Sequence, residues 1–426
     1  MTIMKHLYKK ECEKEIPMRK NNKNTLLYKI LFDKDFPGFI AASIVLFIAY
    51  KFIKIDTVDI SLFLSVFTLF VCNIAGRLIY NLYSNNKEDS IKLSMDYDGI
   101  CKRYKEEPLL TYRNVKLPII VLVKRKLKDK PFNIIMDHKN AANVYSLPEQ
   151  IENRSEWLLD AHRCSYDYDS RTVRLDNLTH KDNKVILTYS NTTYWDLLRT
   201  NRAMDCEWEN RKTNRNVYEP GPFISPLEFS LMANHIGFNG FIEFHEIGIL
   251  FVGRSNKMSV GKKTWGTSIS AKLSPKYDYK KGEHFTLDGF YDSIAESINR
   301  ELKYFRVNGQ PINVTAKQIK GSIFAFYRDL VEGGKPQFLL YHKFGNEKLD
   351  VKFNKDGYES SLKQDKSSAM IDGTKYAFLT IDQLKQAYIT QDEMFISGLK
   401  KKYKMTPSAV ASVVLLLEAM GKEWEI

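Results

Sequence analysis

Two uninterrupted apolar runs stand near the start of the chain. Residues 37–53 read PGFIAASIVLFIAYKFI, with Lys51 as the only charge, and residues 60–76 read ISLFLSVFTLFVCNIAG with no charge. Neither run shows the polar stripe with a period near 3.6 that marks a surface helix of a soluble protein. Each run is about the minimum length that spans a hydrocarbon core of ~30 Å as a helix. The pattern predicts a transmembrane helical hairpin over residues 37–83, with a buried hairpin in a soluble protein as the alternative.

Charged residues flank the two apolar runs unevenly. The segment of residues 1–36 holds nine Lys or Arg, whereas the linker of residues 54–59 holds one lysine and two aspartates. Short basic loops remain on the cytoplasmic side of a membrane. A signal peptide is not predicted, because 36 residues precede the first run and no small-residue cleavage site follows it. We therefore expect a two-span, multi-pass protein with both termini in the cytoplasm.

Beyond residue 83 the polar and apolar positions alternate as they do in strands. Residues 84–108 are polar and compatible with a helix, and residues 115–123 (VKLPIIVLV) predict a strand that Pro118 confines to an edge or a bulge. Further strands are predicted at residues 172–175, 184–189, 267–273, 319–327 and 337–344, and as a pair around Glu246 and Gly248 within residues 240–253.

Two helices stand out in the second half of the chain. Residues 288–305 place their apolar side chains on one face, with Asp288 as a plausible N-cap. Residues 406–424 open with a threonine N-cap and a proline in the first turn, and their apolar part, Val410–Met420, is too short to span a bilayer. The order strand, strand, helix, strand, strand predicts an α/β sandwich in which the first helix covers a mixed sheet.

Composition narrows the class of protein. The 426 residues exceed one compact core, and the apolar fraction of 44% with 27% charged residues excludes wholesale disorder. The five cysteines form no CxxC pair, which argues against a disulfide scaffold or a structural zinc site and suits a reducing compartment. The net charge of +13 favours an anionic partner, either lipid headgroups or a phosphate-bearing ligand.

Common catalytic and metal motifs are missing from the sequence. Gly261-Lys262 is not a Walker A loop, since Asn256 and Lys263 stand where that loop needs Gly and Ser or Thr, and GxSxG, HExxH and GxGxxG do not occur. His235 and His245 lie near two glutamates, but their spacing of ten fits no metal motif, so structural histidines are the interpretation. The basic run at residues 124–130 (KRKLKDK) is either a solvated loop or a contact for phosphate.

One pattern resembles a known family. The order ILFVGR (residues 249–254), Trp265-Gly266 and a helix ending Arg300-Glu301-Leu302 resembles a Nudix domain, whose signature is G, five residues, E, seven residues, R-E-U-x-E-E-x-G-U. At the remaining signature positions this chain has Thr286, Asp292, Tyr304, Phe305 and Val307 in place of Gly, Glu, Glu, Glu and Gly.

The departures from the signature affect its chemistry. The resemblance implies that the missing glutamates would have held divalent cations, and Tyr304 and Phe305 offer no carboxylate. Their rings offer either a stacking surface for a base or core packing. The degenerate signature therefore predicts a binding domain and no enzyme, with no cofactor.

Two apolar runs followed by a degenerate Nudix domain are similar to the two-transmembrane Nudix effectors associated with CD-NTases in bacterial CBASS anti-phage defence. The resemblance implies a cyclic oligonucleotide ligand made by a CD-NTase, homo-oligomerisation, and disruption of the inner membrane through contact with its lipid. It divides the chain into a basic segment (1–36), the hairpin (37–83), a membrane-proximal linker (84–165), and a Nudix-like α/β/α sensor domain with an N-terminal extension and a C-terminal helix (166–426), so the expected fold class is α+β.

The ligand pocket needs a cationic rim and an aromatic wall. The residues predicted to bind ligand are Arg254, Lys262, Lys263, Trp265, Arg300 and Tyr304. Two other functions stay open. One is a membrane-tethered hydrolase of nucleoside diphosphate derivatives, with a metal site around Glu283, Asp288, Asp292, Glu296 and Glu301. The other is a scaffold that holds partners at the membrane.

Overall fold

The computed structural model describes ten stretches of the chain: residues 93–138, 145–153, 171–207, 211–254, 260–273, 286–302, 305–307, 310–345, 359–361 and 373–421. The chain divides into two compact units, and every described residue belongs to the second, which comprises residues 87–362 and 370–426. The predicted segment 1–36 and the predicted hairpin 37–83 lie outside the described residues, and the predicted domain boundaries stay predictions.

The described residues contain no helix that is both long and apolar enough to cross a membrane. The longest, α10 (Leu287–Glu301), has 15 residues, and it combines an apolar face with an exposed polar one. The fold class with a transmembrane hairpin and the two-span inner-membrane localisation are therefore wrong for the part of the chain that the structure describes. That part is a mixed α/β fold built on sheets.

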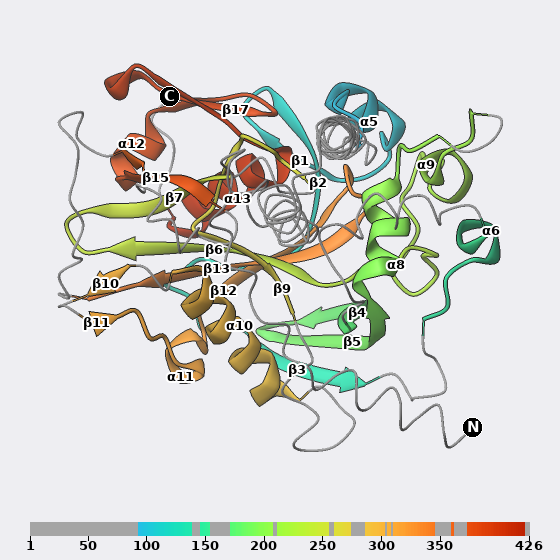
Figure 1. Ribbon diagram of the computed structural model, residues 1–426, viewed down its shortest axis with the longest axis horizontal. Helices are drawn as coiled ribbons and strands as arrows, with labels where there is room; N and C mark the ends of the chain where they lie inside the picture. Colours follow the sequence, from blue (N-terminus) through green and yellow to red (C-terminus); the bar gives the residue numbers. More distant parts are fainter. Residues whose placement is uncertain are drawn as a thin grey trace, which may run out of the picture. The chain divides into compact units, whose positions relative to one another are not determined.

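A large mixed sheet organises the fold (Figure 1). Its order is β1-β2-β12-β13-β6-β7-β15-β14, and every neighbouring pair is antiparallel except β13 and β6. The strands in this order are β1 (Leu109–Tyr112), β2 (Val115–Lys124), β12 (Ile323–Asp329), β13 (Lys335–Lys343), β6 (Gly237–Phe244), β7 (Gly248–Arg254), β15 (Gly373–Leu379) and β14 (Glu359–Ser361). Two short strands attach to it, β8 (Trp265–Gly266) to β7 and β9 (Ile269–Lys272) to β6.

The predicted strand with the proline is β2, which lies inside the sheet between β1 and β12. The pairing of β1 with β2 shifts register between Leu109 and Thr111, whose partners are Ile120 and Lys116, so Pro118 lies within a bulge of β2, as predicted. Its carbonyl accepts from the N–H of Leu330 at 3.0 Å. A proline is tolerated there because the bulge removes the need for its missing N–H.

Side chains alternate between the two faces of the sheet and form two cores. The helix α10 packs on one face, where Phe290, Ile294 and Ile298 contact the core that includes Phe238. The helix α13 (Pro407–Ala419) packs on the other face against the core that includes Phe241. Both helices were predicted from sequence, although the N-cap of α10 is Thr286 and the predicted Asp288 lies in its first turn.

Smaller elements extend the two cores. A second sheet of order β3-β5-β4 supports the α10 face through residues such as Val173 and Leu187. A third, of order β16-β17-β18, supports the α13 face through Met394 and Tyr403. Their strands are β3 (Asn133–His138), β4 (Arg171–Lys181), β5 (Lys184–Thr193), β16 (Ala387–Ile389), β17 (Glu393–Ile396) and β18 (Lys401–Lys404), and the shortest pair is β10 (Arg306–Val307) with β11 (Gln310–Pro311). The other helices within the described residues are α5 (Tyr97–Arg103), α6 (Glu149–Glu152), α8 (Tyr194–Arg199), α9 (Asn214–Tyr218), α11 (Ala316–Ile319), α12 (Ile381–Lys385) and the 3-10 turns η2 (Asn201–Ala203) and η5 (Ser397–Leu399).

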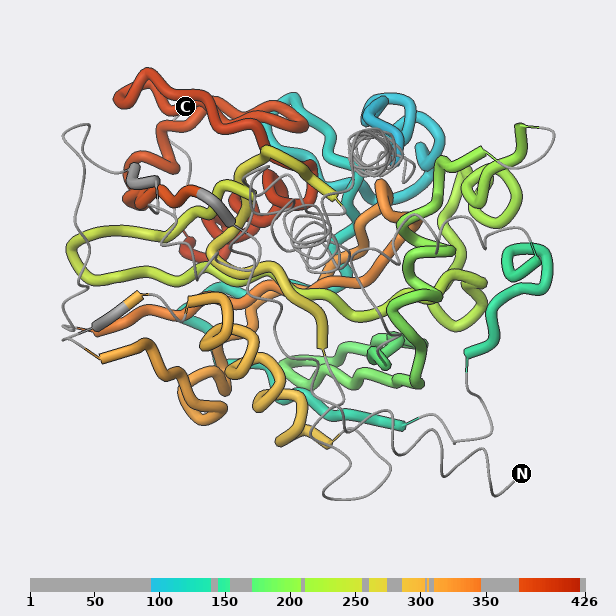
Figure 2. The backbone as a smooth tube through the Cα atoms, in the orientation of Figure 1, coloured from blue at the N-terminus to red at the C-terminus, as the bar shows by residue number. Residues whose placement is uncertain are grey.

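The first described residues lie beside the last third of the chain (Figure 2). The Gln391 amide donates to the carbonyl of Lys116 at 2.8 Å and to the carboxylate of Asp98 at 3.0 Å. The basic loop at residues 124–130 docks in the same way: the Leu127 N–H donates to the carbonyl of Ala419 at the end of α13 (2.7 Å). Lys124 pairs with Glu418 at 2.7 Å. Cations at a helix C-terminus complement its dipole, so this loop has a structural role.

Candidate functional site

A cavity of about 330 Å³ opens at the N-terminal end of α13. Residues distant in sequence meet there: the segment 93–97, the β7–β8 connection around Lys262 and Trp265, the β12–β13 turn at residues 329–335, and residues 404–409 at the start of α13. Asn239 and Gln337 line it from the sheet, on the face that α13 covers. This volume lies at the lower end of the range for small-molecule pockets.

The β7–β8 connection brings Arg254 and Lys262 to the cavity. The Arg254 N–H donates to the carbonyl of Thr264 at 2.7 Å, which closes the connection. Gly261 has a φ of +66°, and a Cβ there would lie 2.8 Å from Cγ2 of Thr406. Glycine is needed at this position because the turn approaches the N-cap of α13 so closely.

The start of α13 forms the adjoining wall. Its N-cap Thr406 accepts from the Ala409 N–H at 3.3 Å, and Pro407 occupies the first helical position, as predicted. Residues Thr406 to Ala409 line the cavity. The first turn of a helix carries a partial positive charge that favours an anion, and here it is joined by cationic side chains.

Three buried charged residues, Asp329, Glu332 and Lys335, form the inner wall together with the partly buried Arg202. The Glu332 carboxylate pairs with Arg202 at 3.3 Å and with Lys335 at 3.5 Å. The side chains of Glu332 and Lys335 are only 6% and 5% exposed. Desolvation would raise the pKa of Glu332, but Arg202 and Lys335 outweigh it and hold that pKa below its ordinary value. Desolvation lowers the pKa of Lys335.

Asp329 is the second carboxylate of this wall, and it is 3% exposed. Its Oδ1 accepts from the Val331 N–H at 3.0 Å. Burial, followed by the charge of Glu332, raises its pKa to about 7. Near neutral pH this carboxyl is therefore partly protonated, whereas Glu332 is ionised.

The side chains that line the cavity carry a net positive charge. Five cationic side chains and two carboxylates line the cavity among the described residues. The cationic set is Arg202, Arg254, Lys262, Lys335 and Lys404. Because the carboxylates are outnumbered and Asp329 is partly neutral, an anionic ligand is favoured.

An aromatic and an amide surface complete the site. Trp265 lines the cavity and packs edge-on against Tyr403, with ring centroids 5.2 Å apart. The Asn239 amide donates to the Tyr327 hydroxyl at 2.8 Å and to Gln337 at 3.2 Å. The hydroxyl groups of Tyr327 and Ser408 lie 2.7 Å apart, which joins this wall to α13. The arrangement provides a ring surface and fixed polar groups beside the cations.

The cavity gathers only part of the predicted ligand set. Arg254, Lys262 and Trp265 line it, whereas Lys263 is exposed and is not among its lining residues. Arg300 lies on α10, which covers the other face of the sheet, and its guanidinium contacts Glu301 at 3.4 Å.

The remaining aromatic prediction concerns the end of α10. Tyr304 lies outside the described residues. Phe305 is 4% exposed and packs in the α10 core against Phe244 and Tyr376. Of the two roles left open for Phe305, packing in the core is the one that the structure shows.

The alternative metal site on α10 is not assembled in the described residues. Asp288, Asp292 and Glu296 are exposed, Glu301 is buried, and Glu283 lies outside the described part. Within that part, no three His, Cys, Asp or Glu side chains are grouped so as to hold a metal ion.

The two histidines flank the strand β6. Residues 235 and 245 are ten positions apart along extended backbone, which separates them by roughly 30 Å. Burial, with a smaller effect of Lys335, holds the pKa of His235 well below its ordinary value. His245 lies 3.6 Å from Glu246. They cannot share a metal ion.

Sequence reasoning missed the inner wall. Asp329, Glu332 and Lys335 lie in the run DLVEGGK, where two glycines between predicted strands indicate a tight turn. Charged residues next to such a turn are usually solvent-exposed, so nothing in the sequence marks these three as buried. Arg202 and Lys404 belong to segments that only the tertiary fold brings to the cavity.

Comparison with protein-family models gives no match, and comparison with curated protein sequences gives none either. The Nudix likeness is therefore carried by the residues quoted above alone.

Proposed function

We propose that this chain is a sensor that binds an anionic nucleotide in the cavity at the start of α13, and that cyclic oligonucleotides are its ligand class. The observation that carries the proposal is the cavity itself, in which five cationic side chains, a helix N-terminus and the Trp265 ring converge. A phosphodiester needs cationic donors, and a base needs a flat surface.

The resemblance to CD-NTase-associated effectors makes cyclic di- and trinucleotides the first ligands to test. A CD-NTase would then be the source of the ligand, and homo-oligomerisation would be the response to binding. The cavity volume suits about one nucleotide unit, so a larger ring would place its other units toward the opening.

The excess of cationic side chains over carboxylates in the cavity lining favours a phosphate. Arg202 and Lys335 lie 3.3 and 3.5 Å from the Glu332 carboxylate. Arg254, Lys262 and Lys404 add three further positive charges to the lining. Charge-assisted hydrogen bonds to phosphate are about twice as strong as neutral ones.

The test is a thermal-shift and calorimetric screen of the purified protein against cyclic di- and trinucleotides. A ligand that binds only the folded state raises the melting temperature with concentration. Arg254→Glu and Lys262→Glu replace attraction by repulsion and should each weaken binding by more than about 2 kcal/mol, which is roughly thirtyfold.

Neighbouring residues provide matched controls for the screen. Lys263→Glu makes the same charge change one residue from Lys262, at an exposed position that does not line the cavity. Arg300→Glu makes it on the other face of the sheet. Both controls should bind like the parent protein. Equal losses from Lys262→Glu and Lys263→Glu would mean that net charge, and not this cavity, governs binding.

A further inference from the structure

We propose that Arg215 and Asp205 are positioning residues that hold the cavity wall of residues 93–97 against the cavity wall of residues 329–335. We call the Arg215–Asp205 pair and its hydrogen bonds to the two walls the lock. Ligand binding and the placement of residues 93–97 are then coupled. The coupling to ligand binding rests on the proposed function. The lock between the two walls does not, because it can be tested in the ligand-free protein.

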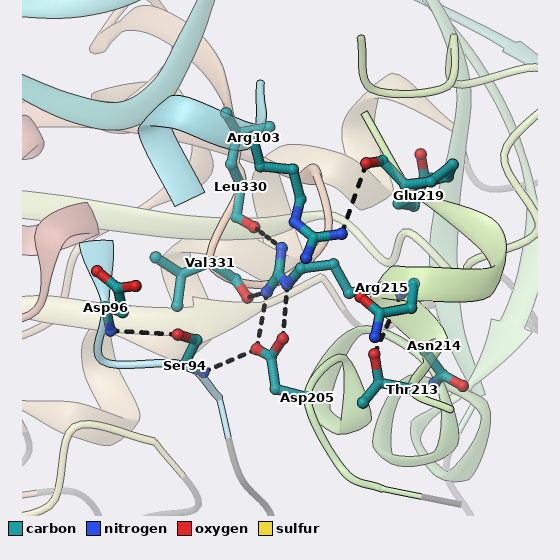
Figure 3. Close-up of polar contacts among 12 residues, drawn as sticks. Ser94, Asp96, Arg103, Asp205, Thr213, Asn214, Arg215, Glu219, Leu330 and Val331 are labelled. Atoms are coloured by element: carbon teal, nitrogen blue, oxygen red, sulfur yellow. Dashed lines mark hydrogen bonds and ion pairs between the residues drawn. The ribbon is translucent and has the colours of Figure 1, made fainter. Parts of the chain in front are cut away.

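The Arg215 side chain is the centre of the lock (Figure 3). It is 3% exposed, and each of its five N–H donors has an acceptor. Two of these N–H groups donate to the carboxylate of Asp205, at 2.6 and 2.8 Å. Burial disfavours the guanidinium charge, but Asp205 outweighs it, so the pKa of Arg215 is raised. A bidentate pair of this kind fixes direction as well as distance.

One side of the lock holds the β12–β13 turn. Arg215 donates to the carbonyl oxygens of Leu330 and Val331, both at 2.7 Å. The next residue is Glu332, whose carboxylate lines the cavity and whose own carbonyl accepts from Asn201 at 2.8 Å. The backbone that places Glu332 is thus held from both sides.

The other side holds the segment 93–97. The N–H of Ser94 donates to Oδ2 of Asp205 at 2.7 Å, which is the same oxygen that Arg215 contacts. The Ser94 hydroxyl accepts from the Asp96 N–H at 3.1 Å, and Asp96 caps α5. Leu93, Ser94, Met95 and Tyr97 line the cavity.

One carboxylate oxygen therefore links the two walls, in addition to the apolar packing of Leu93 and Tyr97 against the cluster that holds Leu330 and Val331. A ligand that contacts both walls favours the arrangement in which they are locked, and by linkage the locked arrangement favours the ligand to the same degree.

The first experiment measures hydrogen exchange in the ligand-free, full-length protein. Arg215→Lys keeps the positive charge but loses the planar guanidinium that donates two hydrogen bonds to Asp205. It should accelerate hydrogen exchange of the amides in both 93–97 and 329–335 about tenfold. Arg103→Lys is the matched control, because Arg103 is nearby and its contact, to the Pro220 carbonyl, is 3.5 Å long. The control should change exchange less than about twofold.

A milder variant guards against loss of the fold. Ser94→Pro removes the N–H that reaches Asp205, together with the hydroxyl that accepts from the Asp96 N–H, and leaves the Arg215–Asp205 pair in place. It should accelerate exchange at the distant turn, in the amides of Val331, Gly333 and Gly334, about threefold. Unchanged exchange at the turn in Ser94→Pro, or acceleration confined to one wall in Arg215→Lys, would overturn the lock.

The second experiment tests the coupling between ligand binding and the lock. Its probes are cyclic di-AMP, cyclic di-GMP and cyclic GMP-AMP. If one of them binds, Arg215→Lys, at a residue that does not line the cavity, should weaken its affinity about threefold; parent-like affinity would contradict the coupling. If none binds the parent protein, the proposed function loses its support while the exchange experiment still decides the lock.

Discussion

The Asp329→Asn substitution tests the electrostatics of the inner wall. The pKa of Asp329 in the folded protein is about 7, raised by burial and then by Glu332, against an ordinary value near 3.9 in the unfolded chain. Between these values the folded state binds more protons than the unfolded state. The Asp329 contribution to stability is therefore greatest at low pH, falls as the pH rises, and levels off above about pH 7.

The magnitude follows from the size of the shift. One pH unit inside this window corresponds to about 1.4 kcal/mol, so from pH 5 to pH 7 the contribution declines by at most about 3 kcal/mol. The positive charges of Lys335 and Arg202 lower the pKa of Asp329 in part, and burial together with the charge of Asp329 in turn raises the pKa of Tyr97 and Tyr327. Asparagine keeps an oxygen for the Val331 N–H but cannot ionise.

The assay is urea unfolding of the parent protein and the variant at pH 5, 6, 7 and 8. The parent should lose stability relative to Asp329→Asn as the pH rises to 7, and the difference should then stay constant. Histidine titration is common to both proteins and cancels in the comparison. Asp382→Asn, at a side chain that is 79% exposed, should show no such trend. A parent-to-variant difference that is the same at pH 5 and pH 8 would refute the raised pKa.

Three further predictions concern packing and chemistry. Gly261→Ala should destabilise the protein by about 1–2 kcal/mol or more, measured by urea unfolding, because its φ is positive and the new Cβ meets Thr406, whereas Gly398→Ala, with nothing within 4 Å, should be nearly neutral. Phe305→Ala should lower the unfolding free energy by about 3–5 kcal/mol, and a loss below about 1 kcal/mol would contradict its place in the core. With magnesium or manganese, the protein should not turn over nucleoside diphosphate derivatives or cyclic oligonucleotides at enzyme-like rates, and sustained turnover abolished by Glu301→Gln would support the hydrolase instead.

Several elements could be read directly from the sequence. The amphipathic period of residues 288–305 predicted α10, and the Thr-Pro start of the last helix predicted the N-cap of α13. The pair of strands around Glu246 and Gly248 is β6 and β7. Local patterns suffice for these elements, because their apolar period and caps act over a few residues.

Part of the site was also within reach of the sequence. Arg254, Lys262 and Trp265 lie within twelve residues of one another, next to a predicted strand, and all three line the cavity. Arg300 was grouped with them by resemblance to the Nudix pattern, yet it belongs to the helix on the opposite face of the sheet. Residues that are close in sequence are also close in the fold where one short connection holds them, as it does for Arg254, Lys262 and Trp265. Arg300 belongs to a different element and is therefore placed elsewhere.

The sequence by itself determined the elements with the clearest apolar period and caps, such as α10 and α13, since propensity and side-chain period are local properties. The strands β3 and β15 and the sheet β16-β17-β18 were not predicted. Only the tertiary structure decided that Asp329, Glu332 and Lys335 are buried against Arg202, and that one oxygen of Asp205 joins Ser94 to Arg215. These contacts span from ten to more than one hundred residues of chain, and their formation depends on how the elements pack. The sequence does not distinguish a charged turn residue that is hydrated from one that is paired with a buried counter-charge. The difference depends on which residues the tertiary fold packs against it.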